Sequence, residues 1–265
     1  MFDCSDVPGE THPAERSRSS MRDDPGPMES SGPNESPAAQ SDTTADESTP
    51  LDPRLSTPFT RCLPGAGEEG TVLLVGVVHD HPASLYRVSH LLSVLSPEIL
   101  ALELPPLAMP LFEAYGRDDY VPPRMGGEMS VALQRAEGAR AVGIDAPNRA
   151  YVRRLFKRLR DDRPSRSVVR RIGRDLVRGT VHALACRAGA GLAALTSIRP
   201  RLYVHIVHGV SLFDAPAEQA DDEAAHVAET KTLLKIIETP PWTQIIDEIR
   251  EETMAENITN LRTEG

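Results

Sequence analysis

The sequence predicts an α/β protein in which a mainly parallel sheet, built on a βαβ unit, is followed by a helical second half. Two observations predict this fold class. Two short apolar runs, "TVLLVGVV" and "EILALEL", flank a segment with helical periodicity, all within residues 71–104. After residue 148 the apolar spacing is mostly helical. Strands early and helices late favour a sheet covered by packed helices.

Residues 1–60 are predicted to be a disordered acidic tail. They are rich in Ser, Pro, Gly and Thr, and their twelve acidic and four basic residues give a net charge of −8. Such a segment buries too little apolar surface to offset the entropy of ordering its backbone. We therefore expect the folded domain to span residues 61–265.

The first βαβ unit follows from three consecutive segments. Thr71–Val78 is a β-branched run after a glycine, which predicts a buried strand. Pro82–Leu95 has apolar residues three or four positions apart, which predicts a helix. Glu98–Leu104 predicts the second strand. Two strands joined through a helix are expected to be parallel, with a right-handed crossover.

Beyond this unit the strands give way to helices. Ala139–Asp145 predicts a third strand, after helices predicted for Leu107–Tyr115 and Glu128–Glu137. From residue 148 the chain is helical and rich in arginine, and Asn148 and Ser165 are expected to cap two of these helices.

The last third of the chain is expected to be helical, with one ambiguous segment. Glu218–Ile237 and Trp242–Leu261 predict helices, whereas Arg199–Phe213 fits either strand or helix. Val181–Ile198 is the most apolar stretch, but it is barely long enough to span a bilayer and contains Arg187. A buried or hairpin-forming helix is the preferred interpretation.

Several classes of protein are disfavoured by what the sequence lacks. The first thirty residues have no apolar segment of the kind found in secretory signals, so a cytoplasmic location is expected. The three cysteines form no C-x-x-C pair, which argues against a thiolate zinc site. The absence of G-x-G-x-x-G and G-K-[ST] loops and the acidic overall charge argue against nucleotide chemistry and nucleic-acid binding.

Three polar residues fall at the ends of predicted strands: His79, Glu103 and Asp145. Ligands of open parallel sheets bind beyond these carboxyl ends. Glu103 lies inside an apolar run, where an unpaired buried charge is costly, so it needs a histidine or a metal ion as a partner. Imidazole and carboxylate ligands suit Zn, Mn or Fe. The simpler interpretation, in which His79 caps the next helix and Glu103 pairs with an arginine, stays open.

Three segments resemble the TraB/PrgY-like family. "GTVLLVGVVHDHPASLYRVSHLLSVLSPEILALEL" resembles its opening, where a strand ending in G-x-x-H leads through a helix and a Pro to a strand ending in Glu. "GGEM" with "ARAVGIDAPNRAYVRRLF", and then "IREETMAENITNL", resemble its later segments. The resemblance covers most of residues 70–261 and implies the EreA/ChaN-like α/β fold. Relatives of that fold include pheromone-shutdown proteins and Tiki-type metal-dependent proteases.

The resemblance assigns site residues motif by motif. It places Gly76 and His79 in the first motif, Glu103 at the second strand end, Glu128 in the G-x-E-M helix and Asp145 at the third strand end. From these positions it implies a metal-dependent hydrolase or peptidase. His79 and Glu103 would hold a divalent ion that lowers the pKa of bound water, and Glu103 or Glu128 would act as the base.

Alternatives to these roles stay open. Glu128 fits equally well as a carboxylate in the first turn of a helix, where the helix dipole favours it. Asp145 fits as a helix N-cap or as a partner of Arg149. On the later helix the resemblance points to Arg250 and Glu252, although the family's Arg-Asp order is altered there to "REET".

The family also has a second G-x-x-H strand after that later helix, and this chain stops at Gly265, where the strand would begin. The domain is therefore expected to lack its C-terminal strand. His205 and His208 precede the helix, so they either substitute for the missing motif or pack in the core.

Two functions other than hydrolysis are also open. The first is a non-catalytic binder of a peptide or small molecule, which the missing histidine motif favours. The second is a membrane-associated regulator, based on the basic amphipathic stretch of residues 149–178. Its acidic residues favour instead a solvated helix face.

Overall fold

The strands of this α/β protein form two separate pairs. In the computed structural model, which describes residues 52–55, 59–65, 69–196 and 198–264, β1 (Thr60–Leu63) pairs antiparallel with β2 (Val72–Val75). β3 (Ile99–Leu102) pairs parallel with β4 (Arg140–Gly143). The parallel part of the predicted sheet is therefore a single pair of strands.

The expected pairing of the first two predicted strands is wrong. β2 and β3 correspond to these strands, but within the described part of the chain no hydrogen-bonded ladder joins them. β2 takes β1 as its partner instead, and β1 was not predicted because its four residues include the polar Thr60 and Arg61. Short runs of apolar residues identify strands but do not specify which strands pair.

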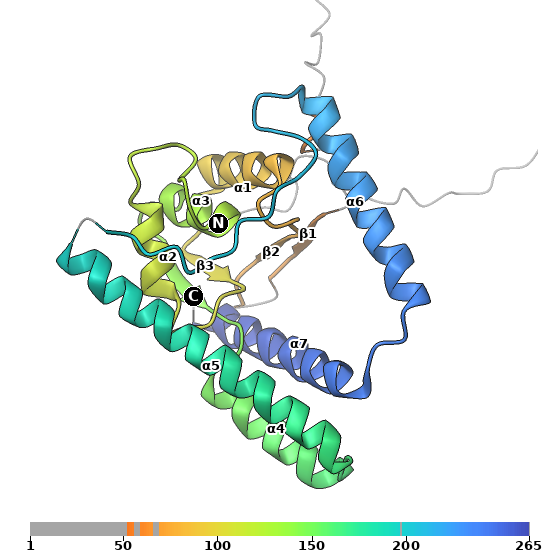
Figure 1. The fold of residues 1–265 in the computed structure, drawn as a ribbon. Helices are drawn as coiled ribbons and strands as arrows, with labels where there is room; N and C mark the ends of the chain where they lie inside the picture. The colour runs from red at the N-terminus through yellow and green to blue at the C-terminus, as the bar shows by residue number, and fades with distance from the viewer. Residues whose placement is uncertain (1–51, 56–58, 66–68, 197, 265) are drawn as a thin grey trace, which may run out of the picture.

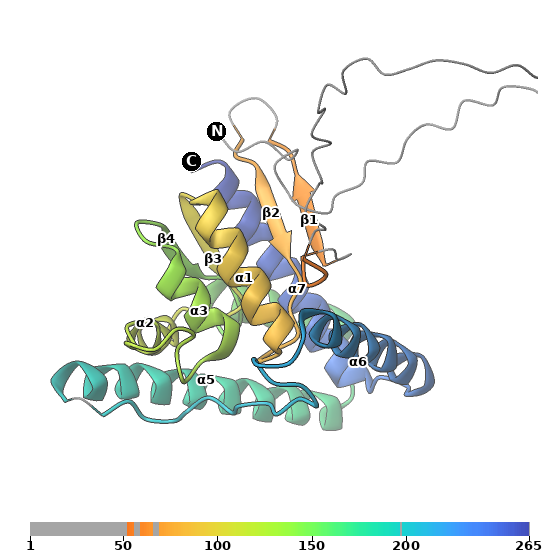
Figure 2. The ribbon, with the colours of Figure 1, turned by 90° about the horizontal axis from the view of Figure 1, so that it is seen from above.

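The helices agree closely with the sequence prediction. They are α1 (Pro82–Leu95), α2 (Met109–Gly116), α3 (Gly127–Arg135), α4 (Arg149–Asp162), α5 (Arg166–Leu195), α6 (Pro216–Ile236) and α7 (Pro241–Arg262). In Figures 1 and 2, α1 and α3 lie on one side of the strands and α7 lies on the other. The long helix α5 runs past one end of the strands (Figure 2).

Side-chain caps explain where several helices begin. The side chain of Asn148 accepts a hydrogen bond from the backbone N–H of Tyr151, and Ser165 accepts one from Val168, so both predicted caps are confirmed. The first helix is capped by His81, whose ring accepts a hydrogen bond from the N–H of Ala83. The alternative in which His79 caps this helix is therefore wrong.

Two groups of buried apolar side chains hold these elements together. The larger one joins α1, α2 and α3 to β3 and includes Leu102, Leu111 and Phe112. The smaller one joins α4, α5 and α7 and includes Leu155 and Ile249. Burying each such side chain contributes about 1.5–3 kcal/mol. The helical second half thus has its own core, separate from the one beneath α1.

The most apolar stretch, residues 181–198, belongs mainly to α5 and is only half buried. Ala183, Cys186 and Gly189 are buried, whereas Leu184 and Leu195 are exposed. The expectation that this helix is buried is therefore wrong for one of its faces. Among the helices of the described residues, none has the length and apolar character needed to cross a bilayer.

The folded part begins before residue 61, where the sequence placed its start. Leu55 is buried, the guanidinium of Arg54 stacks 3.4 Å from the ring centroid of Tyr86, and the backbone carbonyl of Arg54 accepts a hydrogen bond from Arg87. Residues 52–55 therefore pack on α1. The prediction of a disordered tail falls mostly on residues 1–51, which lie outside the described residues.

Candidate functional site

A histidine–carboxylate pair lies where the loop after β2 meets the start of α3. Nδ1 of His79 lies 2.5 Å from Oε1 of Glu128, and Oε2 of Glu128 accepts the backbone N–H of Asp80 at 3.0 Å. Glu128 is 2% exposed. With both carboxylate oxygens occupied, Glu128 fixes the ring so that Nδ1 carries a proton and Nε2 is the nitrogen available for chemistry.

Backbone conformations that are rare for residues with a side chain bring the His79 loop and the start of α3 together. Asp80 has φ of +60°, Gly126 has +86° and Gly127 has +53°. A Cβ at Gly127 would lie 2.3 Å from Oδ1 of Asp80, so only glycine permits this approach. The glycine pair of "GGEM" is thus needed for the contact between His79 and Glu128.

The carboxylate of Asp80 is buried beneath the segment that follows α5. Its Oδ2 accepts the backbone N–H of Ile206 at 2.8 Å, and its Oδ1 lies 3.4 Å from Nδ1 of His205 without a hydrogen bond. In the same segment, Nε2 of His208 lies 2.7 Å from the backbone carbonyl of His79 and donates to it. Arg199–Phe213, which fitted either strand or helix, is neither, and it lies against the His79 loop through these contacts.

His205 and His208 therefore lie beside the His79 loop, at its backbone and at Asp80. Neither lies in the core, since the side chain of His205 is 72% exposed and His208 is only partly buried. His208 also stacks edge-on against His81, with 4.8 Å between the ring centroids. Their contacts hold the loop in place from the outside.

Acidic side chains make His79 more basic. The hydrogen bond that His79 donates to Glu128 is the largest cause of the raised pKa of His79, and the charges of Glu128, Glu103 and Asp80 raise it further. Glu103 directly follows β3 and is exposed. Its charge acts on the imidazole of His79, so the two side chains are near each other.

Asp145, at the end of the third predicted strand, pairs with Arg250 of α7. Nε and Nη2 of Arg250 each donate to a separate oxygen of Asp145 at 2.8 Å. This fork raises the pKa of Arg250. Asp145 is neither the cap of α4, which is Asn148, nor the partner of Arg149, so both of these alternatives are wrong. The charge of Glu103 also acts on Arg250.

Sequence reasoning missed a buried polar group that supports the His79 loop. Ser84 accepts the backbone N–H of Val78 at 2.8 Å and donates to Glu223 of α6 at 2.5 Å. Arg87 pairs with Glu223 through both carboxylate oxygens and donates to the carbonyl of Gly76 at 3.2 Å. Both Ser84 and Arg87 point into the protein from α1. Polar residues on an otherwise apolar helix face were the signal that could have revealed them.

Gly76 shapes the chain just before the loop. Its N–H donates to the carbonyl of Phe59 at 2.5 Å, and a Cβ at Gly76 would lie 3.2 Å from the same oxygen. The glycine of the predicted G-x-x-H motif therefore lets the end of β2 approach Phe59, the residue that precedes β1.

The predicted metal ion has too few ligands here. His79 Nε2 and the carboxylate of Glu103 are two donors, whereas catalytic zinc sites usually have three protein ligands. Among the described residues, no group of three or more His, Cys, Asp or Glu side chains is placed to hold an ion. A divalent ion at His79 and Glu103 therefore stays a prediction, and the chemistry proposed below uses His79 without it.

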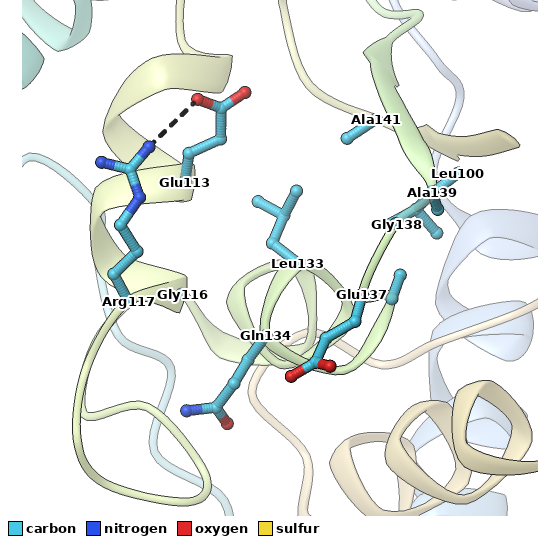
Figure 3. A pocket seen from close by; sticks show the side chains of 11 residues that line it. Leu100, Glu113, Gly116, Arg117, Leu133, Gln134, Glu137, Gly138, Ala139 and Ala141 are labelled. Atoms are coloured by element: carbon cyan, nitrogen blue, oxygen red, sulfur yellow. Dashed lines mark ion pairs between the residues drawn. The ribbon is translucent and has the colours of Figure 1, made fainter. Parts of the chain in front are cut away.

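An open hollow lies away from this site. It has a volume of about 550 Å³ and is lined by the last turns of α2 and α3 and by the start of β4 (Figure 3). Glu113 and Arg117 form an ion pair on its wall. The residues that line it include neither His79 nor Asp80 nor Glu128. The hollow and the His79 loop are therefore separate sites.

Comparison of the chain with family models, with curated proteins and with solved structures finds no match in any of the three.

Proposed function

We propose that the protein is a hydrolase in which His79 acts as general acid and base and Glu128 positions it. The observation that carries this proposal is the 2.5 Å contact between a half-exposed imidazole and a buried carboxylate. A carboxylate on Nδ1 leaves Nε2 free toward solvent and stabilises the imidazolium that forms when Nε2 takes a proton.

In the proposed reaction, Nε2 of His79 takes a proton from water as the water attacks a carbonyl carbon of a peptide or ester. The same imidazole then returns the proton to the leaving nitrogen or oxygen. The raised pKa of His79 makes it a stronger base. Glu103, whose charge acts on the imidazole, supports the protonated state. Glu128 is reassigned from base to positioning residue, because both its oxygens already accept hydrogen bonds.

A relationship to the TraB/PrgY-like proteins is part of this proposal. Four residues selected by that resemblance form two direct contacts, His79 with Glu128 and Asp145 with Arg250. They come from the three segments that carry the resemblance, and each contact joins two different segments. Motif residues that contact one another in pairs support a shared site more strongly than any single motif does.

The test is hydrolysis of a mixed peptide library and of activated esters by the full chain. His79→Ala should lower the rate by roughly 10²–10⁴-fold, the usual contribution of a general acid–base group. His90→Ala, at the far end of α1, is the matched control and should leave the rate unchanged. Measuring the metal content of the same samples tests separately whether the chain binds a divalent ion. A rate that is the same in His79→Ala and the unmodified chain would refute the proposal.

The alternative function is non-catalytic binding of a peptide or small molecule. The hollow lined by α2, α3 and β4 favours it, because its polar wall lies apart from the His79 loop. Recovery of an intact peptide bound to the chain after hours of incubation, together with no cleaved product, would support this alternative over hydrolysis.

A further inference from the structure

The outward side of α5 carries a continuous line of exposed residues. Successive members are three or four positions apart, except between Leu184 and Leu192. The exposed Ala188 lies midway between these two, four positions from each. They are Arg166, Arg170, Arg174, Val177, Val181, Leu184, Leu192 and Leu195. We call this line the outer face of α5. Its five aliphatic side chains are between 43% and 87% exposed.

The opposite side of the same helix attaches it to the protein. Ile172, Ala183, Cys186 and Gly189 are buried there. Figure 2 shows α5 as the long helix that forms one edge of the molecule. The outer face is therefore not part of the protein core, and its aliphatic side chains lie in water unless something covers them.

The charge of α5 indicates what covers it. The helix contains six arginines and a single acidic residue, Asp175, in a chain whose net charge is −10. The ion pairs found within the described residues involve none of these six arginines, whereas Arg154 and Arg158 of the neighbouring α4 pair with glutamates of α7. Unpaired arginines beside exposed aliphatic residues match a surface that offers both anionic groups and hydrocarbon.

We propose that the outer face of α5 binds the surface of an anionic lipid bilayer. In this arrangement the helix lies in the membrane plane, its aliphatic residues enter the boundary between headgroups and acyl chains, and its arginines contact lipid phosphates. A helix of 30 residues is about 45 Å long, so it presents one extended line of contact. No crossing of the bilayer is involved.

Other partners fit the same face less well. Nucleic acid would use the arginines but would leave the aliphatic residues without a role, and the line contains no aromatic side chain for base stacking. A second copy of the chain docked in parallel would place Arg170 and Arg174 against their own equivalents, which repel. An anionic bilayer offers contacts to the arginines and to the aliphatic residues of the outer face at once.

The experiment is co-sedimentation of the full chain with large vesicles at low salt. Vesicles of phosphatidylglycerol mixed with phosphatidylcholine should pellet the protein, and vesicles of phosphatidylcholine alone should not. Arg170→Gln/Arg174→Gln removes two positive charges, each worth roughly fivefold in partitioning, so binding should weaken about 25-fold. Val181→Glu/Leu184→Glu should abolish it.

Matched substitutions away from α5 provide the controls. Arg135→Gln removes an exposed arginine at the end of α3, and Val94→Glu replaces an exposed valine of α1. Both should bind anionic vesicles as the unmodified chain does. Circular dichroism and thermal melting of every variant establish that it is folded, so a loss of binding reports on the surface.

Three results would overturn the proposal. The first is no sedimentation of the folded, unmodified chain with anionic vesicles. The second is binding that the α5 variants retain in full. The third, measured by light scattering without lipid, is a dimer that Val181→Glu/Leu184→Glu converts to a monomer, because a second copy would then cover this face.

Discussion

Nδ1 of His79 and Oε1 of Glu128 lie 2.5 Å apart although 49 positions separate the two residues in sequence. The contact joins the loop before α1 to the first turn of α3. It is possible because Glu128 also accepts the N–H of Asp80 and because Gly127 lets the two backbones approach. The properties of His79 therefore depend on groups from three parts of the chain.

Replacing Glu128 with Gln should lower the pKa of His79, because the carboxylate is the largest cause of its elevation. Folding raises this pKa above its ordinary value of about 6.5, so the protonated ring contributes stability. That contribution is complete below a pH of about 6.5 and is lost as the pH rises through the raised pKa. Histidine NMR titrations and urea unfolding across this range measure both effects. An unchanged pKa of His79 would contradict the assignment of Glu128.

Gly127→Ala should destabilise the protein by about 1–3 kcal/mol, because Ala would adopt a φ of +53° and place its Cβ 2.3 Å from Oδ1 of Asp80. Gly173→Ala is the matched control. Gly173 lies inside α5 with nothing within 4 Å of an added Cβ, so this change should stabilise the helix by up to about 1 kcal/mol. Urea unfolding measures both. Equal effects of the two substitutions would show that the close approach of Gly127 to Asp80 does not require glycine.

Glu223→Ala should cost about 3–5 kcal/mol, because it leaves the guanidinium of Arg87 buried without its charge partner. The double variant Arg87→Met/Glu223→Leu should recover most of this loss, since it removes both charges and keeps the volume. Chemical denaturation of the two variants gives the comparison. If the double variant is no more stable than Glu223→Ala, the cost comes from lost hydrogen bonds, those of Ser84 to Glu223 and of Arg87 to the carbonyls of Arg54 and Gly76, and not from the unpaired charge.

Tyr151 should ionise only at strongly alkaline pH, because burial raises its pKa to about 12. The folded-state pKa lies above the ordinary value of about 10, so the neutral phenol contributes stability. This stability is present below pH 10 and is lost as the pH rises through about 12. Near-ultraviolet absorbance should show a late titration step that is smaller in Tyr151→Phe. Identical curves for the two proteins would contradict the burial of this phenol.

The helices could be predicted because their signals are local. Pro82 begins α1 and Leu95 ends it, as the spacing of apolar residues indicates, and Asn148 and Ser165 cap the helices that follow them. Each of these signals lies within a few residues of the feature it predicts. The resemblance also selected His79, Glu128, Asp145 and Arg250, which form two contacting pairs in the structure.

The pairings between distant segments could not be predicted in the same way. Nothing in the β2 sequence indicates that β1 is its partner. The ambiguous segment Arg199–Phe213 is held by contacts with Asp80 and His79, which are distant in sequence. The role of Glu128 depended on a positive φ at Gly127, which its neighbours in sequence do not reveal. The exposed side of α5 was predicted to be buried. This prediction failed because the composition of a helix does not show which of its faces packs against the protein.

Within the part of the chain that the structure describes, no hydrogen-bonded ladder joins β2 and β3, and this has a consequence for the site. Hydrogen-bonded neighbours are held about 4.8 Å apart, but here the separation of the two strand pairs is set by side chains beneath α1. His79 follows one pair and Glu103 follows the other, so their mutual distance is adjustable. The imidazole stays beside Glu128 because the two are directly hydrogen-bonded, whereas its distance from Glu103 depends on how the side chains beneath α1 pack.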